Sequence, residues 1–139
     1  MNCFSFEEIE LDQKVSFEYE INEEKMQKFR EITGDLNPLH CDLNYAKEKG
    51  YNENVVYGML SASILSTLAG MYLPGKKSLI HEVEIKFAKP VFLSKMPLTV
   101  NAKVVSKDER FKQITLKYTI EDNTKSKEVR GTMKVGVTD

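Results

Sequence analysis

A carboxylate and an imidazole stand five positions apart in the segment Thr-Gly-Asp-Leu-Asn-Pro-Leu-His, which ends at His40. Between Asp35 and His40 the residues favour turns, and Pro38 disfavours helical backbone at Asn37. We therefore expect a tight loop that holds the two side chains close together. Because histidine titrates near neutral pH, such a pair can hold one water molecule and move its proton. The pattern indicates acid–base chemistry rather than a metal site.

Simpler interpretations of these residues stay open at this point. Glycine, aspartate, asparagine and proline are all favoured in turns, so the segment can also be a structural turn without chemistry. Cys41 follows His40 directly, but neighbouring side chains in extended backbone point apart, which argues against a cysteine nucleophile. His81 is the only other histidine, and we expect it to be exposed at the start of a strand.

The elements that must hold this loop can be read on both sides of it. Before the loop, apolar and polar residues alternate over 15–21, which predicts a strand with one buried face. Asn22 can cap the helix that follows, and Gly34 can end it. The apolar residues of this helix recur at intervals of three: Met26, Phe29 and Ile32.

After the loop, Asp42 can cap a short helix over 44–49 that Gly50 ends. The stretch 57–73 is small and apolar on nearly every side, which is typical of a buried helix. Its serines and its marginal length argue against a membrane span, so no membrane partner is expected.

Four further strand-like runs follow a Pro-Gly turn, each with apolar residues at alternate positions: 83–87, 98–104, 114–120 and 129–137. Short polar connections between them are typical of antiparallel hairpins. We therefore predict a single α+β domain over 1–139, with an antiparallel sheet of about five strands wrapped around one long central helix. Such a sheet leaves edges and apolar surface at its rim, so a homodimer or a higher homo-oligomer is expected.

The composition fits one globular domain in a reducing compartment. With 139 residues, 41% of them hydrophobic and 29% charged, the chain can bury one core. Two cysteines without a CxxC pair support neither a disulfide framework nor a thiolate zinc site, so a cytoplasmic location is expected. The first eleven residues carry acids in place of the basic and apolar run of an export signal.

Charge is divided unevenly along the chain, although the formal net charge is only −1. Residues 1–55 hold six Lys and Arg against thirteen Asp and Glu, whereas residues 56–139 hold fourteen against eight. A basic second half can attract a polyanionic small molecule or a nucleic acid. Lysines scattered over exposed strand faces explain it more simply, and no nucleic acid partner is expected.

The pattern from Phe29 to Ala46 resembles the signature of a known family. Phe29, Thr-Gly-Asp, Asn-Pro-Leu-His and Ala46 stand at the spacing of the MaoC-like dehydratases, the (R)-specific enoyl-CoA hydratases of the hot-dog fold. The run Val-Tyr-Gly-Met-Leu over 56–60 is similar to the hydrophobic-His-Gly-Met-Leu run that opens their central helix. Segments 73–76 and 87–92 also look like the family, so the resemblance extends over nearly the whole chain.

This resemblance implies a hydro-lyase. The family adds water reversibly and syn to a trans-2-enoyl thioester of CoA or an acyl carrier, giving an (R)-3-hydroxyacyl thioester without a metal or redox cofactor. By the same resemblance, Asp35 orients and deprotonates the water, while His40 holds it and passes on its proton. Two alternatives share the fold: an acyl-CoA thioesterase and a non-catalytic acyl-thioester-binding subunit.

Three further residues take supporting roles in this hypothesis. The backbone N–H of Gly58, at the start of the central helix, is the candidate oxyanion donor, because unpaired helix amides favour an anion and glycine allows close approach. Asn37 is expected to brace the loop by bonding nearby backbone. Ser66 is expected to support His40 or the substrate by hydrogen bonding.

Four side chains are predicted to contact the substrate: Tyr57, Met59, Leu60 and Lys76. Met59 and Leu60 would close an acyl pocket. Lys76 and its neighbour Lys77, which follow the Pro-Gly turn, can bind a CoA phosphate or simply be solvated. Tyr57 replaces the family's usual histidine. A phenol keeps a hydrogen-bond donor but titrates near about pH 10, so we expect this replacement to change the acyl preference more than the reaction type.

Overall fold

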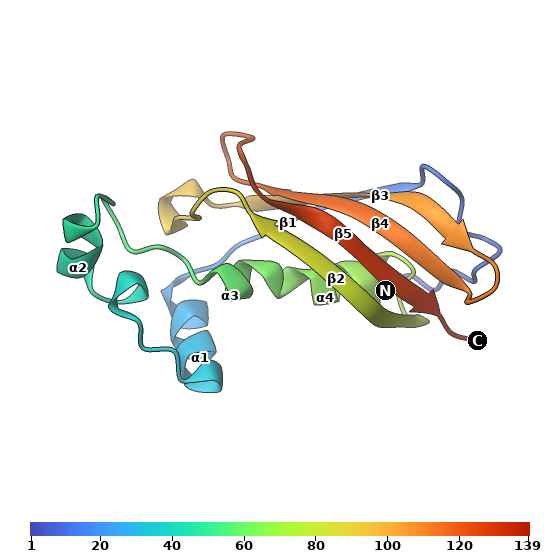
Figure 1. Cartoon of the computed structure of the whole chain (residues 1–139), viewed down its shortest axis with the longest axis horizontal. Coiled ribbons are helices and arrows are strands. Elements are labelled where there is room, and N and C mark those ends of the chain that lie inside the picture. The colour runs from blue at the N-terminus through green and yellow to red at the C-terminus, as the bar shows by residue number, and fades with distance from the viewer.

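Five antiparallel strands form one curved sheet that covers a single run of helix (Figure 1). The structure is a computed structural model and describes all 139 residues. The strands are β1 (Lys14–Tyr19), β2 (Ser78–Phe87), β3 (Leu98–Asp108), β4 (Gln113–Glu121) and β5 (Lys127–Val137), arranged in the order β1-β3-β4-β5-β2. The predicted α+β architecture is confirmed.

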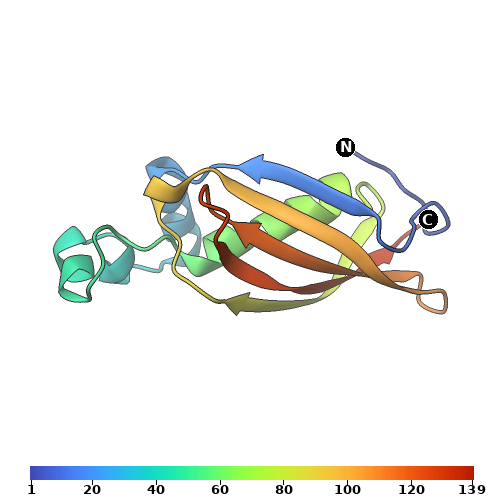
Figure 2. The ribbon, with the colours of Figure 1, turned by 90° about the horizontal axis from the view of Figure 1, so that it is seen from above.

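Alternation of apolar and polar residues explains the three central strands. On β4, alternate side chains are fully buried: Ile114, Leu116, Tyr118 and Ile120. β4 forms antiparallel hairpins with both β3 and β5, as the short polar connections predicted. β1 then pairs with β3, and β2 pairs with β5, so the first two strands of the chain form the two edges of the sheet (Figure 2). Because β2 is an edge strand, one side of its backbone is unpaired.

The central helix confirms the helix predicted over 57–73. It consists of three consecutive segments: α3 (Gly58–Ala62), α4 (Ile64–Thr67) and a π-helical turn, η2 (Leu68–Tyr72). Two contacts hold it to β1. The Tyr19 hydroxyl donates to the Ser61 carbonyl at 2.8 Å, and the Phe17 ring stacks on Tyr72 with 4.2 Å between centroids. No helix of the chain has the length and apolar content that crossing a membrane requires.

One side of this helix is exposed, which corrects the expectation that it is buried all round. Met59 is 60% exposed, and Ser63 and Ser66 are exposed as well. These residues are four and three positions apart, so they share one helix face. That face is on the side of β2, where the apolar side chains of Val83 and Phe87 are also exposed. Apolar composition alone did not reveal that the sheet leaves this face of the helix uncovered.

The predicted loop and its two flanking helices project beyond the end of the sheet (Figures 1 and 2). We call residues 22–50 the arm; it contains α1 (Glu23–Thr33), a 3-10 turn, η1 (Pro38–His40), and α2 (Leu43–Glu48). Within these bounds only Met26 and Ala46 are buried. The arm therefore has little core of its own.

Local sequence explains where the helices of the arm begin and end. The side chains of Asn22 and Asp42 each accept a hydrogen bond from a backbone N–H of the helix that follows, and Gly34 ends α1 with a φ of 71°. These predicted caps are confirmed. Ile32 is 82% exposed, so it does not share the buried position of Met26, although the two residues belong to the same apolar repeat. The end of α1 lies beyond the sheet (Figure 1).

The segment after the arm is tied to the connection between β2 and β3. This connection contains a second 3-10 turn, η3 (Leu93–Lys95). Ser94 donates hydrogen bonds from its backbone N–H and its hydroxyl to the carboxylate of Glu53. The rings of Tyr51 and Phe92 lie 6.0 Å apart. These contacts hold the segment that directly follows α2 against the connection between β2 and β3.

Candidate active site

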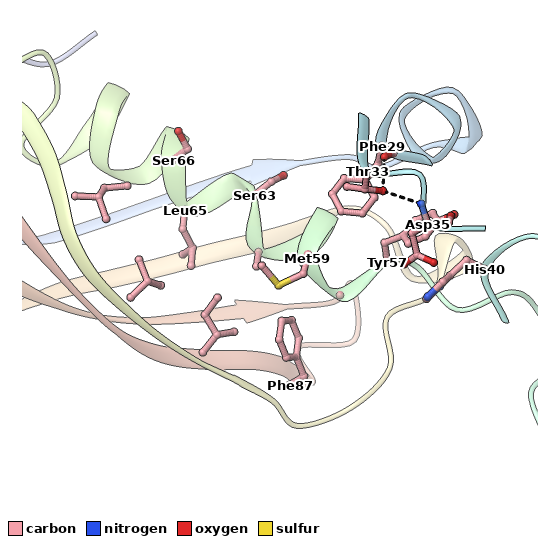
Figure 3. A pocket seen from close by; sticks show the side chains of 15 residues that line it. Phe29, Thr33, Asp35, His40, Tyr57, Met59, Ser63, Leu65, Ser66 and Phe87 are labelled. Atoms are coloured by element: carbon pink, nitrogen blue, oxygen red, sulfur yellow. Dashed lines mark hydrogen bonds between the residues drawn. The ribbon is translucent and has the colours of Figure 1, made fainter. Parts of the chain in front are cut away.

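A cavity of about 750 Å³ lies where the arm, the start of the central helix and β2 meet (Figure 3). Asp35 and His40 enter it from the arm, and Tyr57 and Gly58 enter it from the helix start. The other lining residues are mostly apolar: Phe29, Thr33, Met59, Ala62, Ser63, Leu65, Ser66, Ile80, Val83, Ile85 and Phe87. A cavity with a polar end and an apolar body suits an amphiphilic ligand.

Hydrogen bonds within the loop orient Asp35. One carboxylate oxygen, Oδ1, accepts from the backbone N–H of Asn37 at 3.0 Å. The backbone N–H of Asp35 donates to the Thr33 hydroxyl at 3.2 Å, and that hydroxyl donates to the Phe29 carbonyl at 2.8 Å (Figure 3). Asn37 also accepts from the N–H of Leu39 at 3.0 Å, so its side chain braces the loop. The second carboxylate oxygen has no protein partner and is available to a ligand.

The surroundings of His40 decide which of its ring nitrogens can act. Nδ1 lies 2.7 Å from the carbonyl oxygen of Val55. A carbonyl oxygen only accepts, so Nδ1 carries the hydrogen, and in the neutral imidazole Nε2 keeps a free lone pair. One face of the ring lies on Tyr57, with 4.1 Å between centroids. His40 can therefore accept a proton at Nε2 while its ring is held in place.

Tyr57 connects the arm to the central helix and is only 1% exposed. Its hydroxyl donates to the backbone carbonyl of Asp35 at 2.7 Å and accepts from Nε of Arg30 at 2.9 Å. Its ring also contacts Phe29, with 5.0 Å between centroids. The hydrogen bond to Tyr57 raises the pKa of the Arg30 guanidinium above its usual value, so this group stays charged. One signal in the sequence could have indicated Arg30: it follows Met26 by four positions, on the same face of α1.

Gly58 leaves space at the start of the central helix. It is the first residue of α3, so its backbone N–H has no acceptor within the helix. A Cβ at this position would lie 3.1 Å from the ring of Phe87, closer than an ordinary contact. Glycine therefore keeps this end of the cavity open, and its N–H is available to an oxygen that carries negative charge.

The structure brings most of the predicted site residues together. Six of them line the cavity: Asp35, His40, Tyr57, Gly58, Met59 and Ser66. Leu60 does not line it and packs against the hydrophobic core. Lys76 follows the opposite end of the central helix, which is about 22 Å long, so its role in substrate binding stays a prediction. No group of three or more His, Cys, Asp or Glu side chains is placed to hold a metal ion.

The sequence did not point to the apolar wall that β2 contributes. Ile80, Val83, Ile85 and Phe87 line the cavity opposite the exposed face of the central helix. The alternation over 83–87 predicted a strand with a buried face, and Val83, Ile85 and Phe87 do lie on one side of β2. That side borders the cavity, and of these residues only Ile85 also packs against the core.

Comparison with known proteins finds related sequences over most of the chain. A model of the MaoC-like domain family matches residues 6–126. The (R)-specific enoyl-CoA hydratase of Aeromonas caviae is 34% identical over 89 residues, which are 64% of this chain and 66% of that protein. A protein of the same name from Rhodospirillum rubrum is 33% identical over 86 residues, 62% of this chain and 60% of that protein. The chain thus spans two thirds or less of these curated relatives.

Solved structures extend the similarity to the fold. An (R)-hydratase from A. caviae involved in PHA biosynthesis has a TM-score of 0.87 at 29% identity, covering 93% of this chain and 97% of that chain. An R-hydratase from Pseudomonas aeruginosa, in the unliganded form, has a TM-score of 0.89 at 26% identity, covering 97% and 86%. The sheet wrapped around one helix is therefore shared with these proteins.

Proposed function

This chain belongs to the MaoC-like domain family of the hot-dog fold, and from that premise we propose that it is an (R)-specific enoyl-thioester hydratase. One observation carries the proposal. The unpartnered oxygen of Asp35 and the free Nε2 of His40 belong to side chains that line one cavity, whose remaining walls are mostly apolar. This combination suits a substrate with a reactive end that takes up water and a hydrocarbon tail.

In the proposed reaction, Asp35 and His40 hold one water molecule between them. As the water oxygen forms a bond to C3 of the trans-2-enoyl thioester, one O–H bond breaks and its proton passes to the dyad. The π electrons of the C2–C3 bond move toward the thioester carbonyl, giving an enolate. The dyad then delivers a proton to C2 on the same face, so one C–O bond and one C–H bond form without oxidation or reduction.

The enolate places negative charge on the thioester oxygen, which needs a hydrogen-bond donor in a fixed position. We assign this role to the backbone N–H of Gly58, because that N–H has no acceptor within the helix and the cavity reaches it. A donor of this kind is worth about 10²- to 10³-fold in rate. Met59 and Ser66, on the exposed helix face, would lie along the acyl chain.

The test is to mix the protein with crotonyl-CoA and follow two signals, the absorbance of the conjugated enoyl thioester and the release of free thiol. Hydration removes the absorbance without releasing thiol. Thiol release instead would identify a thioesterase and contradict the proposal. We expect Asp35→Asn and His40→Ala each to lower kcat by at least about 10²-fold, the usual scale of acid–base catalysis.

Two matched variants control for unspecific effects of these substitutions. Asp108→Asn changes another exposed carboxylate that accepts backbone N–H bonds, at the end of β3, and His81→Ala removes the other histidine, which is exposed on β2. Both residues lie outside the cavity lining, so we expect both variants to keep wild-type rates. Equal losses in the control and the dyad variants would contradict the assigned roles.

A further inference from the structure

We infer that Arg30 and Tyr57 form a positioning relay that holds the catalytic groups in place, and that Tyr57 does not contact the reacting atoms. This inference rests on the proposed function. It concerns two side chains that meet across 27 positions of sequence, at the junction between the arm and the central helix.

The relay is a chain of two hydrogen bonds whose direction is fixed. Arg30 only donates, and the backbone carbonyl of Asp35 only accepts, so the Tyr57 hydroxyl must receive the first bond and give the second. A charged donor polarises the hydroxyl and strengthens its own donation. The bond to Asp35 therefore anchors the backbone from which the catalytic carboxylate extends.

The same side chain contacts the other proposed catalytic groups. The ring of Tyr57 supports the ring of His40 at 4.1 Å between centroids, and Tyr57 immediately precedes Gly58, the candidate oxyanion donor. Tyr57 thus supports the carboxylate of Asp35, the imidazole of His40 and the backbone N–H of Gly58. Because the arm buries only Met26 and Ala46 between its ends, this support contributes to how the arm is held on the central helix.

The hydroxyl has no hydrogen left for a substrate. Its one proton is directed at Asp35, and its accepting site is used by Arg30. Tyr57 therefore lines the cavity without offering it a hydrogen-bond donor, and its hydroxyl forms hydrogen bonds within the protein. In this inference Tyr57 positions the catalytic groups and does not select the acyl group of the substrate.

The setting of Arg30 indicates that stability alone does not explain the relay. Its side chain is only 19% exposed, its Nη2 is buried without a hydrogen-bond partner, and the nearest carboxylate oxygen, on Glu23, is 3.8 Å away. Burying a donor without a partner costs stability. What Arg30 contributes is therefore the orientation of the Tyr57 hydroxyl.

The first test compares Tyr57→Phe with Tyr118→Phe. Each variant removes one buried tyrosine hydroxyl that donates to a backbone carbonyl at 2.7 Å, but Tyr118 bonds Glu84 within the sheet and does not line the cavity. We expect similar losses of Tm in both. Only Tyr57→Phe should lower kcat, by about 10- to 100-fold, because small displacements of catalytic groups have effects of that size. KM for crotonyl-CoA should stay within about twofold of wild type, since positioning of the dyad is not substrate binding.

The second test uses Arg30. Arg30→Lys keeps a charged donor near the Tyr57 hydroxyl and should restore most of the kcat that Arg30→Met loses. A spectroscopic readout goes with it: in Tyr57→Phe, loss of the hydrogen bond moves the carbonyl ¹³C resonance of Asp35 upfield, whereas Tyr118→Phe leaves that resonance in place.

These measurements separate failure of the relay from failure of the proposed function. If the wild-type protein hydrates no enoyl thioester, the proposed function fails, and the NMR comparison still decides whether Tyr57 holds Asp35. If the wild type is active and Tyr57→Phe keeps its kcat, the relay is overturned. A rise in KM alone would also overturn it, because that result would make Tyr57 a substrate contact.

Discussion

Replacing Gly58 by alanine would have two opposing effects, a gain in helix propensity and a close contact with Phe87. Gly58 is the first residue of a helix, where alanine gains at most the preference of about 1 kcal/mol that it has over glycine in a helix interior. A methyl group there would also crowd the ring of Phe87 at 3.1 Å, on the wall of the cavity. We expect Gly58→Ala to change the free energy of unfolding by less than about 1 kcal/mol. Its kcat/KM should fall by about 10-fold, the scale of one extra methylene in a binding pocket.

Gly70→Ala is the matched control for this prediction. Gly70 also lies in the central helix, but a Cβ there would meet only Oγ of Ser78, at 4.0 Å, and the residue does not line the cavity. We expect Gly70→Ala to keep wild-type kinetics. Urea unfolding and steady-state kinetics on both variants give the comparison, and equal kinetics in the two would contradict the assigned place of Gly58.

Single residues differ in how well the sequence reveals them. Asp35 and His40 are close in sequence, so turn chemistry alone places them in one loop, and the structure shows both lining one cavity. Arg30 and Tyr57 are separated by 27 positions and meet only through the fold. Nothing local in the sequence can pair a charged helix residue with a tyrosine that precedes another helix.

At the scale of elements, the hairpin of β4 and β5 contains a pair of carboxyl groups that controls stability against pH. Burial raises the pKa of Glu128 above its ordinary value, and hydrogen bonding to Asp122 adds to the rise. Asp122 behaves oppositely: burial raises its pKa, but hydrogen bonds from Thr124, Glu128 and the backbone outweigh burial and lower it. The raised pKa of Glu128 therefore stabilises the fold at low pH, and the lowered pKa of Asp122 stabilises it at higher pH.

The sign of each contribution follows from linkage. The raised pKa of Glu128 gives stability that is present below the unfolded value of 4.5 and is lost as the pH rises through the folded value. The lowered pKa of Asp122 gives stability that is present above 3.8 and is lost as the pH falls through its folded value. At neutral pH the fold therefore keeps the contribution of Asp122 and has lost that of Glu128.

We expect Glu128→Gln to gain stability relative to wild type as the pH rises from about 4.5 toward neutrality, because it removes the buried charge that Glu128 acquires there. Urea unfolding at several pH values measures this difference. Glu121→Gln, on the adjacent strand, removes a carboxyl group that is only half-buried and serves as the comparison for loss of a carboxylate from this hairpin. A pH-independent difference for Glu128→Gln would contradict the prediction.

Most elements could be predicted from periodicity and caps, and the exceptions have local causes. β2 begins at Ser78, five residues before the predicted run at 83–87. A register shift between Ile80 and Glu82 breaks the alternation there, so the pattern was readable only beyond it. The helix over 57–73 was correct in extent, but its exposed face was not predictable, because sequence periodicity does not show how far the sheet curves around it.

At the scale of the whole molecule, the uncovered edge of the sheet predicts self-association. Leu79, Ile80, Val83 and Phe87 of β2 are between 37% and 57% exposed, and one side of the β2 backbone is unpaired. Exposed apolar edge strands favour pairing with another strand. We propose a homodimer in which two copies of β2 face each other. The sheet order behind this proposal was not predictable, because β1 and β2 pair with strands far along the chain.

Light scattering tests this proposal. The wild-type protein should have a mass near twice 16.0 kDa. Val83→Lys places a charge on the exposed face of β2 and should give a monomer. Val105→Lys is its control, because Val105 is 41% exposed, close to the 37% of Val83, but lies on β3. A monomeric wild type, or equal effects of the two variants, would contradict the proposed interface.

The sparse core of the arm also determines the order in which the protein loses its properties on heating. Segments with few buried contacts open at a lower free energy than the sheet that supports them. When the arm detaches, Asp35 and His40 leave the cavity while the five strands remain paired. Inactivation should therefore precede melting of the sheet, and since nothing in the sheet has to refold, the activity should return on cooling.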